Sequence, residues 1–508
     1  MSSHHGRALL ALLFTVLTLL PASASRASEG ESAESGGGPA SSDVALPMPM
    51  ERIDDVVDRA LARRELSRAR VGVLVQALET GDVLYERNAD EPFIPASNMK
   101  IVTAAALLDF LGPWFTYETV VSASSHIDNG VVGDLYVEGR GDPSLVFEEM
   151  VRLAESLRFR GLTKVEGDIV LDDSWFREPG PVGPEATDGD RAYHARVGAL
   201  SFNFNAVAVR VAPGNEAGDP AVVSLSPDVG FVELRNEAVT ASSRRRSTIN
   251  VRRVMLQGRN VITVEGRVPA GTSGKVYYRS LDDPTGWFGA AFVDLLRRSG
   301  VQVGGQVRLG EAPDDAVELV RHESKPLSLL VRDLGKYSNN FIAEQLMLTL
   351  AAEWEAPPGT METASEIVED YLNDLSGADL NIGPSPLVRI VDGSGLSRRN
   401  RLSPRVIVMV LGELLTSFET SYEYGGSFSV SGADGTLSDR MGYPQLYLKV
   451  RAKTGLLDGV TAISGIVETR DDEEVLFSII VNGFECEAWR SHDLEHAIID
   501  AIREGRDD

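Results

Sequence analysis

Apolar positions at the two ends of the folded sequence follow the periods of a mixed α/β protein. The first expected helix carries its apolar residues on one face, at Ile53, Val56, Val57, Ala60 and Leu61. Strands are expected at 71–77 and 83–87, on either side of the turn Glu79-Thr80-Gly81-Asp82. Helical patterns return at 341–352 and 489–503. The pattern predicts one α+β domain built from 48–115 and 326–508.

The middle of the chain has a different pattern. Short β-type stretches separated by Gly, Pro, Asn and Asp stand at 130–137, 167–171, 206–211, 231–234 and 260–268. A helical pattern appears near 287–299. We therefore expect a large β-rich insertion, 116–325, with a smaller domain nested inside it at about 178–275.

The N-terminus has the pattern of an export signal. Arg7 precedes thirteen mostly apolar residues, 8–20, and Ala22-Ser23-Ala24 supplies small residues for cleavage. Such a run is too short for a lasting transmembrane helix, which needs about 20 residues. The sequence therefore predicts a signal peptide at 1–24 and a flexible leader at 25–47, rich in Ser, Gly and Glu. We expect an exported protein of the periplasm or cell envelope without a stable membrane anchor.

Charge and cysteine content exclude several classes of function. The chain has 49 Lys and Arg against 75 Asp and Glu, a net charge of −26, which disfavours nucleic-acid binding. Its one cysteine, Cys486, rules out an internal disulfide and a cysteine-based metal cluster. No metal or other cofactor is expected.

The first motif with catalytic potential is Ser97-Asn98-Met99-Lys100, which follows Pro95 and begins an apolar helical pattern. The spacing places Lys100 one helical turn from Ser97, on the same face. A serine hydroxyl needs a neighbouring base to become a nucleophile, and a buried lysine with a lowered pKa can serve. Alone, this motif is also typical of an ordinary helix start.

The second motif is Ser338-Asn339-Asn340, at an expected turn-to-helix transition where both Ser338 and Asn340 can face one cleft. Ser201-Phe202-Asn203 has the same form, but the alternation over 201–207 predicts a strand there. We therefore prefer Ser338.

The third motif is Lys453-Thr454-Gly455 on an expected strand. Lysine and threonine at a strand edge can bind a carboxylate, and glycine allows a ligand backbone to approach closely.

Taken in this order, the three motifs resemble the signature of penicillin-recognising serine enzymes. Ser97 and Ser338 are 241 positions apart, and the chain therefore resembles the low-molecular-mass class C penicillin-binding proteins, D-Ala-D-Ala carboxypeptidase/endopeptidases with a large insertion. The resemblance extends to the stretches 141–145, 392–398 and 432–437. It implies a transpeptidase-like catalytic domain and peptidoglycan peptides ending in D-Ala-D-Ala as substrate, with β-lactams acylating the same serine.

The resemblance also implies a role for each motif residue. Ser97 attacks the carbonyl between the terminal D-alanines, Lys100 takes its proton, and Ser338, tuned by Lys453, relays a proton to the leaving amine. Asn340 binds the peptide, and Lys453 and Thr454 hold the terminal carboxylate. The N–H groups of Ser97 and Leu456, next to Gly455, form the oxyanion hole.

A pocket for the side chain of the stem peptide is implied as well. The matching positions are Asp188, Tyr193 and Arg398, with Asp190 as an alternative to Asp188. An acid and an arginine together suit a zwitterionic side chain.

Three other interpretations are open to the sequence. His492-Asp493-Leu494-Glu495-His496 has the form of an inverted zinc-peptidase motif, but a solvated face of the last helix is favoured. The main alternative is a non-catalytic peptidoglycan-binding or assembly protein of the same fold. The intact motifs speak against it, because a binding role needs no Ser-x-x-Lys base. A β-lactamase would need a deacylating segment that we do not identify.

Overall fold

The computed structural model describes residues 53–177, 189–378, 380 and 387–504. The predicted signal peptide and leader lie outside these ranges, as does Asp188. Within them, no helix combines the length and apolar character needed to cross a membrane.

A six-stranded antiparallel sheet joins the two ends of the chain. Its strands are β1 (Arg70–Ala77), β2 (Val83–Arg87), β19 (Ser429–Val430), β20 (Val450–Leu457), β21 (Val460–Glu468) and β22 (Glu474–Asn482). Their order is β19-β20-β21-β22-β1-β2, so the early strand β1 pairs with the last strand, β22. The predicted pairing of segments before 115 with segments after 326 is thus present in one sheet.

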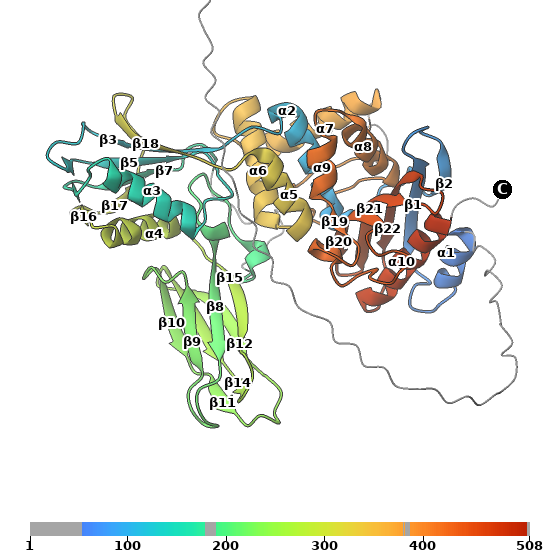
Figure 1. Cartoon of the computed structure of the whole chain (residues 1–508), viewed down its shortest axis with the longest axis horizontal. Coiled ribbons are helices and arrows are strands. Elements are labelled where there is room, and N and C mark those ends of the chain that lie inside the picture. The colour runs from blue at the N-terminus through green and yellow to red at the C-terminus, as the bar shows by residue number, and fades with distance from the viewer. Residues whose placement is uncertain (1–52, 178–188, 379, 381–386, 505–508) are drawn as a thin grey trace, which may run out of the picture. The chain divides into compact units, whose positions relative to one another are not determined.

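Helices pack on both faces of this sheet because side chains alternate along its strands. In β22, Leu476 and Ile480 join the core formed with α2, α6 and α8, whereas Phe477 and Ile479 join the core under α1 and α10. Figure 1 shows α1 and α10 together on one side. The helices of this part are α1 (Ile53–Leu61), α2 (Met99–Leu111), α5 (Leu327–Tyr337), α6 (Asn340–Trp354), α7 (Met361–Ser376), α8 (Pro404–Thr416), α9 (Ser421–Ser427) and α10 (Ala488–Glu504).

A second group of sheets is built from the outer parts of the insertion. The five-stranded sheet has the order β17-β7-β5-β3-β18, and a small sheet has the order β16-β6-β4. The bounds are β3 (Glu118–Ala123), β4 (Val131–Val132), β5 (Leu135–Gly139), β6 (Lys164–Val165), β7 (Ile169–Asp172), β16 (Gln302–Val303), β17 (Val307–Leu309) and β18 (Val317–Glu323), with helices α3 (Phe147–Phe159) and α4 (Pro284–Arg298). Helix α4 lies at the helical pattern expected near 287–299, whereas α3 was not expected.

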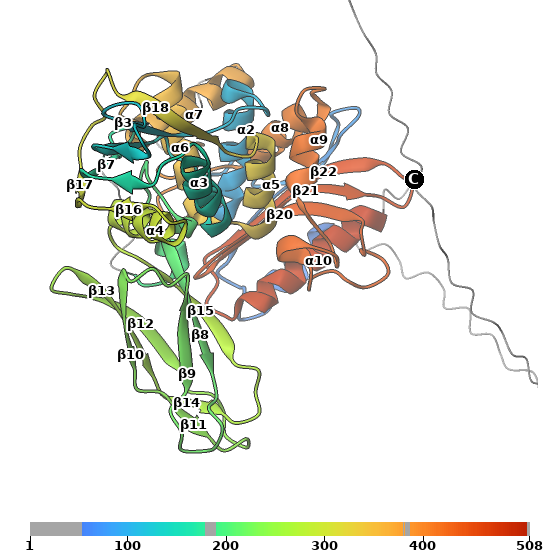
Figure 2. The ribbon, with the colours of Figure 1, turned by 60° about the vertical axis from the view of Figure 1, so that its left-hand side comes forward.

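Strands from the centre of the insertion pair only with one another among the described residues (Figure 2). They are β8 (Ala206–Ala212), β9 (Val222–Ser226), β10 (Val232–Asn236), β11 (Val239–Ala241), β12 (Asn250–Leu256), β13 (Arg259–Glu265), β14 (Arg267–Pro269) and β15 (Lys275–Ser280). This sheet membership agrees with a nested β unit. The domain boundaries themselves stay a prediction.

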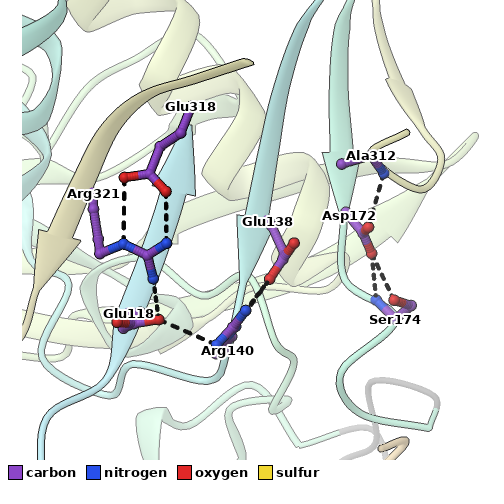
Figure 3. A network of polar contacts seen from close by, with 8 residues as sticks. All are labelled: Glu118, Glu138, Arg140, Asp172, Ser174, Ala312, Glu318 and Arg321. Atoms are coloured by element: carbon purple, nitrogen blue, oxygen red, sulfur yellow. Dashed lines mark hydrogen bonds and ion pairs between the residues drawn. The ribbon is translucent and has the colours of Figure 1, made fainter. Parts of the chain in front are cut away.

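Charged side chains link neighbouring strands of the five-stranded sheet, as Figure 3 shows. Glu118 on β3 accepts hydrogen bonds from Arg140, just after β5, and from Arg321 on β18. Arg140 also donates to Glu138, and Arg321 to Glu318. These groups are about a third exposed, so we assign the network a small contribution to stability.

Helix α6 is fastened to the insertion by one buried side chain. Gln345 accepts a hydrogen bond from Gly198 N (3.2 Å) and donates to Gly198 O (3.0 Å) and Gly141 O (3.3 Å). The side chain is fully buried. The insertion is therefore anchored directly beside the helix that begins at Asn340.

We predict that Gln345→Ala lowers the free energy of unfolding by about 1–3 kcal/mol, because it leaves buried backbone groups unpaired. Chemical denaturation measures the change. Gln306→Ala is the control, since Gln306 is exposed and only its backbone makes hydrogen bonds in the described structure. A loss for Gln345→Ala no larger than for the control contradicts the prediction.

Candidate active site

Ser97 lies in a short 3-10 turn, Ala96–Asn98, directly before α2. Ala96 has a positive φ of 47°, and the loop glycine Gly395 packs against its carbonyl, where a Cβ would lie 1.8 Å from that oxygen. Lys100 is in the first turn of α2. Its Nζ donates to Ser97 Oγ at 3.0 Å, which confirms the expectation that the two side chains share a face.

Lys100 is held by three oxygen acceptors and is 2% exposed. Besides Ser97 Oγ, its Nζ donates to Asn340 Oδ1 (2.8 Å) and to the carbonyl of Ser394 (2.6 Å). Burial lowers the pKa of Lys100 to about 7, although the carboxylates of Glu344 and Asp392 oppose the shift. A lysine in this state can exchange a proton with Ser97 near neutral pH.

Ser338 and Asn340 come from the junction of two helices. Ser338 ends α5 in the left-handed conformation, with φ of 56°, and Asn340 is the first residue of α6. Ser338 Oγ accepts a hydrogen bond from Lys453 Nζ at 2.7 Å. Lys453 is 1% exposed, and burial, together with the charge of Lys100, lowers its pKa well below the usual value.

Strand β20 brings the third motif against the nucleophile. A Cβ on Gly455 would lie 3.0 Å from both Pro95 O and Ser97 N, so a larger residue there would press β20 against the backbone at the nucleophile. Thr454 Oγ1 donates to Thr436 Oγ1 at 2.8 Å, and Leu456 is more than half exposed. Strand β19 pairs with β20 only at residues 451–452. Beyond that point this edge of β20 has no partner strand in the described structure.

The residues expected in the side-chain pocket are placed unequally. Tyr193 is half exposed, and its carbonyl accepts a hydrogen bond from Asn340 Nδ2 at 3.4 Å, which brings the insertion to the site. Arg398 donates to Asp458 O, just after β20, at 2.9 Å. Asp190 pairs with Arg279 at 3.3 Å and accepts from Arg253 N. Asp190 is thus held by the guanidinium of Arg279 and the backbone N–H of Arg253, an arrangement that disfavours it as the pocket acid.

The predicted strand over 201–207 is wrong in its first half. Asn203, Phe204 and Asn205 all have positive φ, and β8 begins only at Ala206. Ser201 Oγ instead donates to Gly198 O and accepts from Asn205 Nδ2, so polar side chains stabilise a buried turn. The preference for Ser338 over Ser201 agrees with these contacts.

The possible zinc motif forms a different contact. Arg440 donates to Glu495 Oε2 at 2.8 Å and to His496 Nε2 at 3.2 Å. Burial lowers the pKa of His496 to about 4, and Glu495 is fully buried. The expected helix is present. The prediction that this motif lies on a solvated face is wrong at Glu495, which is buried. Arg440 thus binds Nε2 of His496, one of the two ring nitrogens through which a histidine can bind a metal.

Sequence reasoning missed three contributors to this site. Ser394 supplies only its carbonyl oxygen, which every residue type has, and Glu344 binds backbone N–H groups of the same loop. Thr436 acts through Thr454. Ser394 and Thr436 fall within the resembling stretches 392–398 and 432–437, and that position was the one available signal.

Comparison with known proteins places this geometry in a family. Residues 53–503 match the D-Ala-D-Ala carboxypeptidase 3 (S13) family. The chain belongs to this family.

Relatives agree with the assignment. A D-alanyl-D-alanine carboxypeptidase of Actinomadura sp. (strain R39) is 36% identical over 470 residues, which are 88% of this chain and 84% of that protein. D-alanyl-D-alanine carboxypeptidase DacB of Haemophilus influenzae is 27% identical over 427 residues, 82% of this chain and 86% of that protein. The crystal structure of penicillin-binding protein 4 from Haemophilus influenzae superposes with a TM-score of 0.76 at 24% identity, covering 89% of this chain and all of the other.

Membership confirms the predicted penicillin-binding-protein fold with its insertion, and the enzyme class, a serine-type D-Ala-D-Ala carboxypeptidase. It favours the enzyme over the non-catalytic alternative. A peptidoglycan substrate is consistent with the family's activity.

We predict that Gly455→Ala slows acylation by a β-lactam at least about tenfold, because the added methyl group pushes β20 away from Ser97 and misaligns the reacting groups. Stopped-flow or quenched-gel kinetics with a labelled penicillin measures the rate. Gly412→Ala in α8 is the control, since its Cβ would make an ordinary 3.5 Å contact with Leu476. Equal acylation rates in the two variants would contradict the prediction that the close approach of β20 to Ser97 is needed for acylation.

Proposed function

We propose that Ser97 is the nucleophile of this carboxypeptidase and Lys100 its general base. The observation that carries the proposal is the arrangement of acceptors around Lys100 Nζ. A neutral amine has two N–H bonds and one lone pair. With its hydrogens on Asn340 Oδ1 and Ser394 O, the lone pair of Lys100 faces the hydroxyl of Ser97.

The reaction then follows in balanced steps. The Ser97 proton moves to Lys100 Nζ, and Oγ bonds to the carbonyl carbon of the penultimate D-alanine. The amide bond to the terminal D-alanine breaks, and its nitrogen takes a proton from Ser338 Oγ. Ser338 regains a proton from Lys453 Nζ, which contacts it at 2.7 Å, and Lys453 receives in turn the proton that Lys100 took from Ser97, so both lysines return to their starting state. Water then hydrolyses the acyl-enzyme and releases the shortened peptide.

The unpaired edge of β20 suits an extended peptide. A substrate strand can add to this edge through main-chain hydrogen bonds, with the carboxylate near Lys453 and Thr454. The close approach of Gly455 to Ser97 N supports an oxyanion hole formed by the N–H groups of Ser97 and Leu456.

The same acyl transfer can cut cross-links, in which the leaving amine belongs to a stem-peptide side chain. We propose this endopeptidase activity, with Tyr193 and Arg398 beside the site and Asp188 as the acid. β-Lactams are proposed to acylate Ser97, because the Haemophilus influenzae penicillin-binding protein 4 has been crystallised in complex with one. An exported location in the periplasm or cell envelope follows from the substrate and the predicted signal peptide.

The first test incubates the mature protein with a fluorescent penicillin beside Ser97→Ala. We expect the wild-type mass to rise by one β-lactam in intact-mass spectrometry, and the variant mass to stay unchanged, because the variant lacks the hydroxyl that Lys100 contacts. An adduct on the Ser97→Ala variant would show that another residue is the nucleophile. No adduct and no hydrolysis in the wild type would refute the catalytic proposal.

The second test follows the acylation rate with pH. The reactive form of Lys100 is the amine, and its pKa is about 7. The rate should therefore fall as the pH drops below this value, approaching tenfold for each further pH unit. Rates with a chromogenic β-lactam between about pH 5 and 9 measure the profile, with Ser97→Ala as the blank. A rate independent of pH in this range contradicts the role of Lys100.

A further inference from the structure

Lys100 is oriented by Asn340 Oδ1 and by the carbonyl oxygen of Ser394. The position of this carbonyl depends on how the loop that carries it is held. The loop Asp392-Gly393-Ser394-Gly395 passes between α2 and α6. Glu344 on α6 binds it through both carboxylate oxygens: Oε1 accepts from Ser394 N (3.1 Å) and Oε2 from Gly393 N (3.3 Å). The carbonyl of the same Ser394 contacts Lys100.

Glu344 stands four residues after Asn340, so the two side chains share one face of α6. Asn340 contacts Lys100 directly, and Glu344 contacts it through the loop. Glu344 is 1% exposed, and a buried carboxylate is unfavourable unless hydrogen bonds and an opposite charge compensate. The two backbone N–H groups supply the hydrogen bonds, and Lys100 can supply the charge.

The charged groups that act on Lys100 come from three elements: Glu344 from α6, Asp392 from the loop and Lys453 from β20. Asp392 binds within its own loop, accepting from Gly395 N, Ser397 N and Asn400 Nδ2. Glu344 is therefore the acid that joins the loop to the helix carrying Asn340.

Lys100 and Glu344 titrate in the same range and so behave as a pair. Burial raises the pKa of Glu344 to about 8, with Asp392 adding to the rise, whereas the loop N–H groups and Lys100 lower it. Each Glu344 oxygen accepts an N–H, and the Lys100 nitrogen meets three acceptors. These contacts suit the state after Lys100 has taken the proton of Ser97, when its ammonium can donate to all three acceptors and the carboxylate of Glu344 balances its charge.

We propose that Glu344 is a positioning residue for the base: it holds the Ser394 carbonyl against Lys100 Nζ and supplies the negative charge that faces the lysine once it is protonated. The inference rests on the proposed role of Lys100. No bond to Glu344 forms or breaks in the reaction.

The test is Glu344→Gln, assayed as the rate of acylation by a chromogenic β-lactam against pH. Glutamine offers one acceptor oxygen to two N–H donors and carries no charge. We expect the maximal rate to fall about tenfold or more. We also expect the acidic limb to move to lower pH by about 1 unit or more, because a lysine that no longer faces a carboxylate loses its proton more readily.

Two control variants separate charge from structure. Thr103→Val removes the hydrogen bond from Thr103 Oγ1 to Gly393 O (2.7 Å), which holds the same loop without charge. It should lower the maximal rate and leave the limb in place. Glu353→Gln lies on the same helix but away from the loop, and should change neither quantity.

An unmoved limb in Glu344→Gln, with or without a lower rate, overturns the proposal. Failure of the wild type to be acylated is a separate result, which refutes the proposed function instead. If Glu344→Gln does not fold, as judged by thermal melting, Glu344→Asp still decides. Keeping the charge should keep the limb at its wild-type position, and a limb displaced by a pH unit in Glu344→Asp overturns the inference.

Discussion

The site depends on one buried amine. Lys100 is almost fully buried, and its Nζ makes hydrogen bonds to three oxygen atoms. The surrounding elements each supply one part of this arrangement. Helix α2 supplies the lysine and the serine, α6 supplies the amide, and a loop supplies the carbonyl. Burial lowers the pKa of the lysine to about 7, and the oxygens of Asn340 and Ser394 direct the hydrogens of its neutral amine. The contacts that hold Lys100 in the protein interior are therefore also the ones that prepare it to act as a base.

The sequence predicted what depends on side-chain identity at short spacing. Ser97 and Lys100 are one turn apart on a helix, and that geometry needs no tertiary information. The spacing of apolar residues likewise predicted β1, β2 and the last helix. Prediction failed where tertiary contacts decide. The run after Ser201 alternates like a strand, yet hydrogen bonds from Ser201 and Asn205 stabilise a turn. Helix α3, with Met150, Leu153 and Leu157 on its buried face, was hidden by its many charged residues.

Helix α6 carries two polar contacts between the catalytic part and the insertion. Gln345 binds the backbone of Gly141 and Gly198, and five positions earlier Asn340 binds the backbone of Tyr193. Both contacts use main-chain atoms of the insertion. Because main-chain atoms do not depend on residue type, side chains at these positions of the insertion can change while both contacts are kept.

The pairing of β1 with β22 has a consequence for the life history of the chain. Ser97 and Lys100 are made early, but the strand that carries Lys453 and the strand that completes the sheet are the last to leave the ribosome. Until then β1 has β2 as a partner but lacks its other neighbour, β22, and Ser338 lacks Lys453. The active site is thus assembled from both ends of the chain, and its geometry is complete only when the last strands have been made.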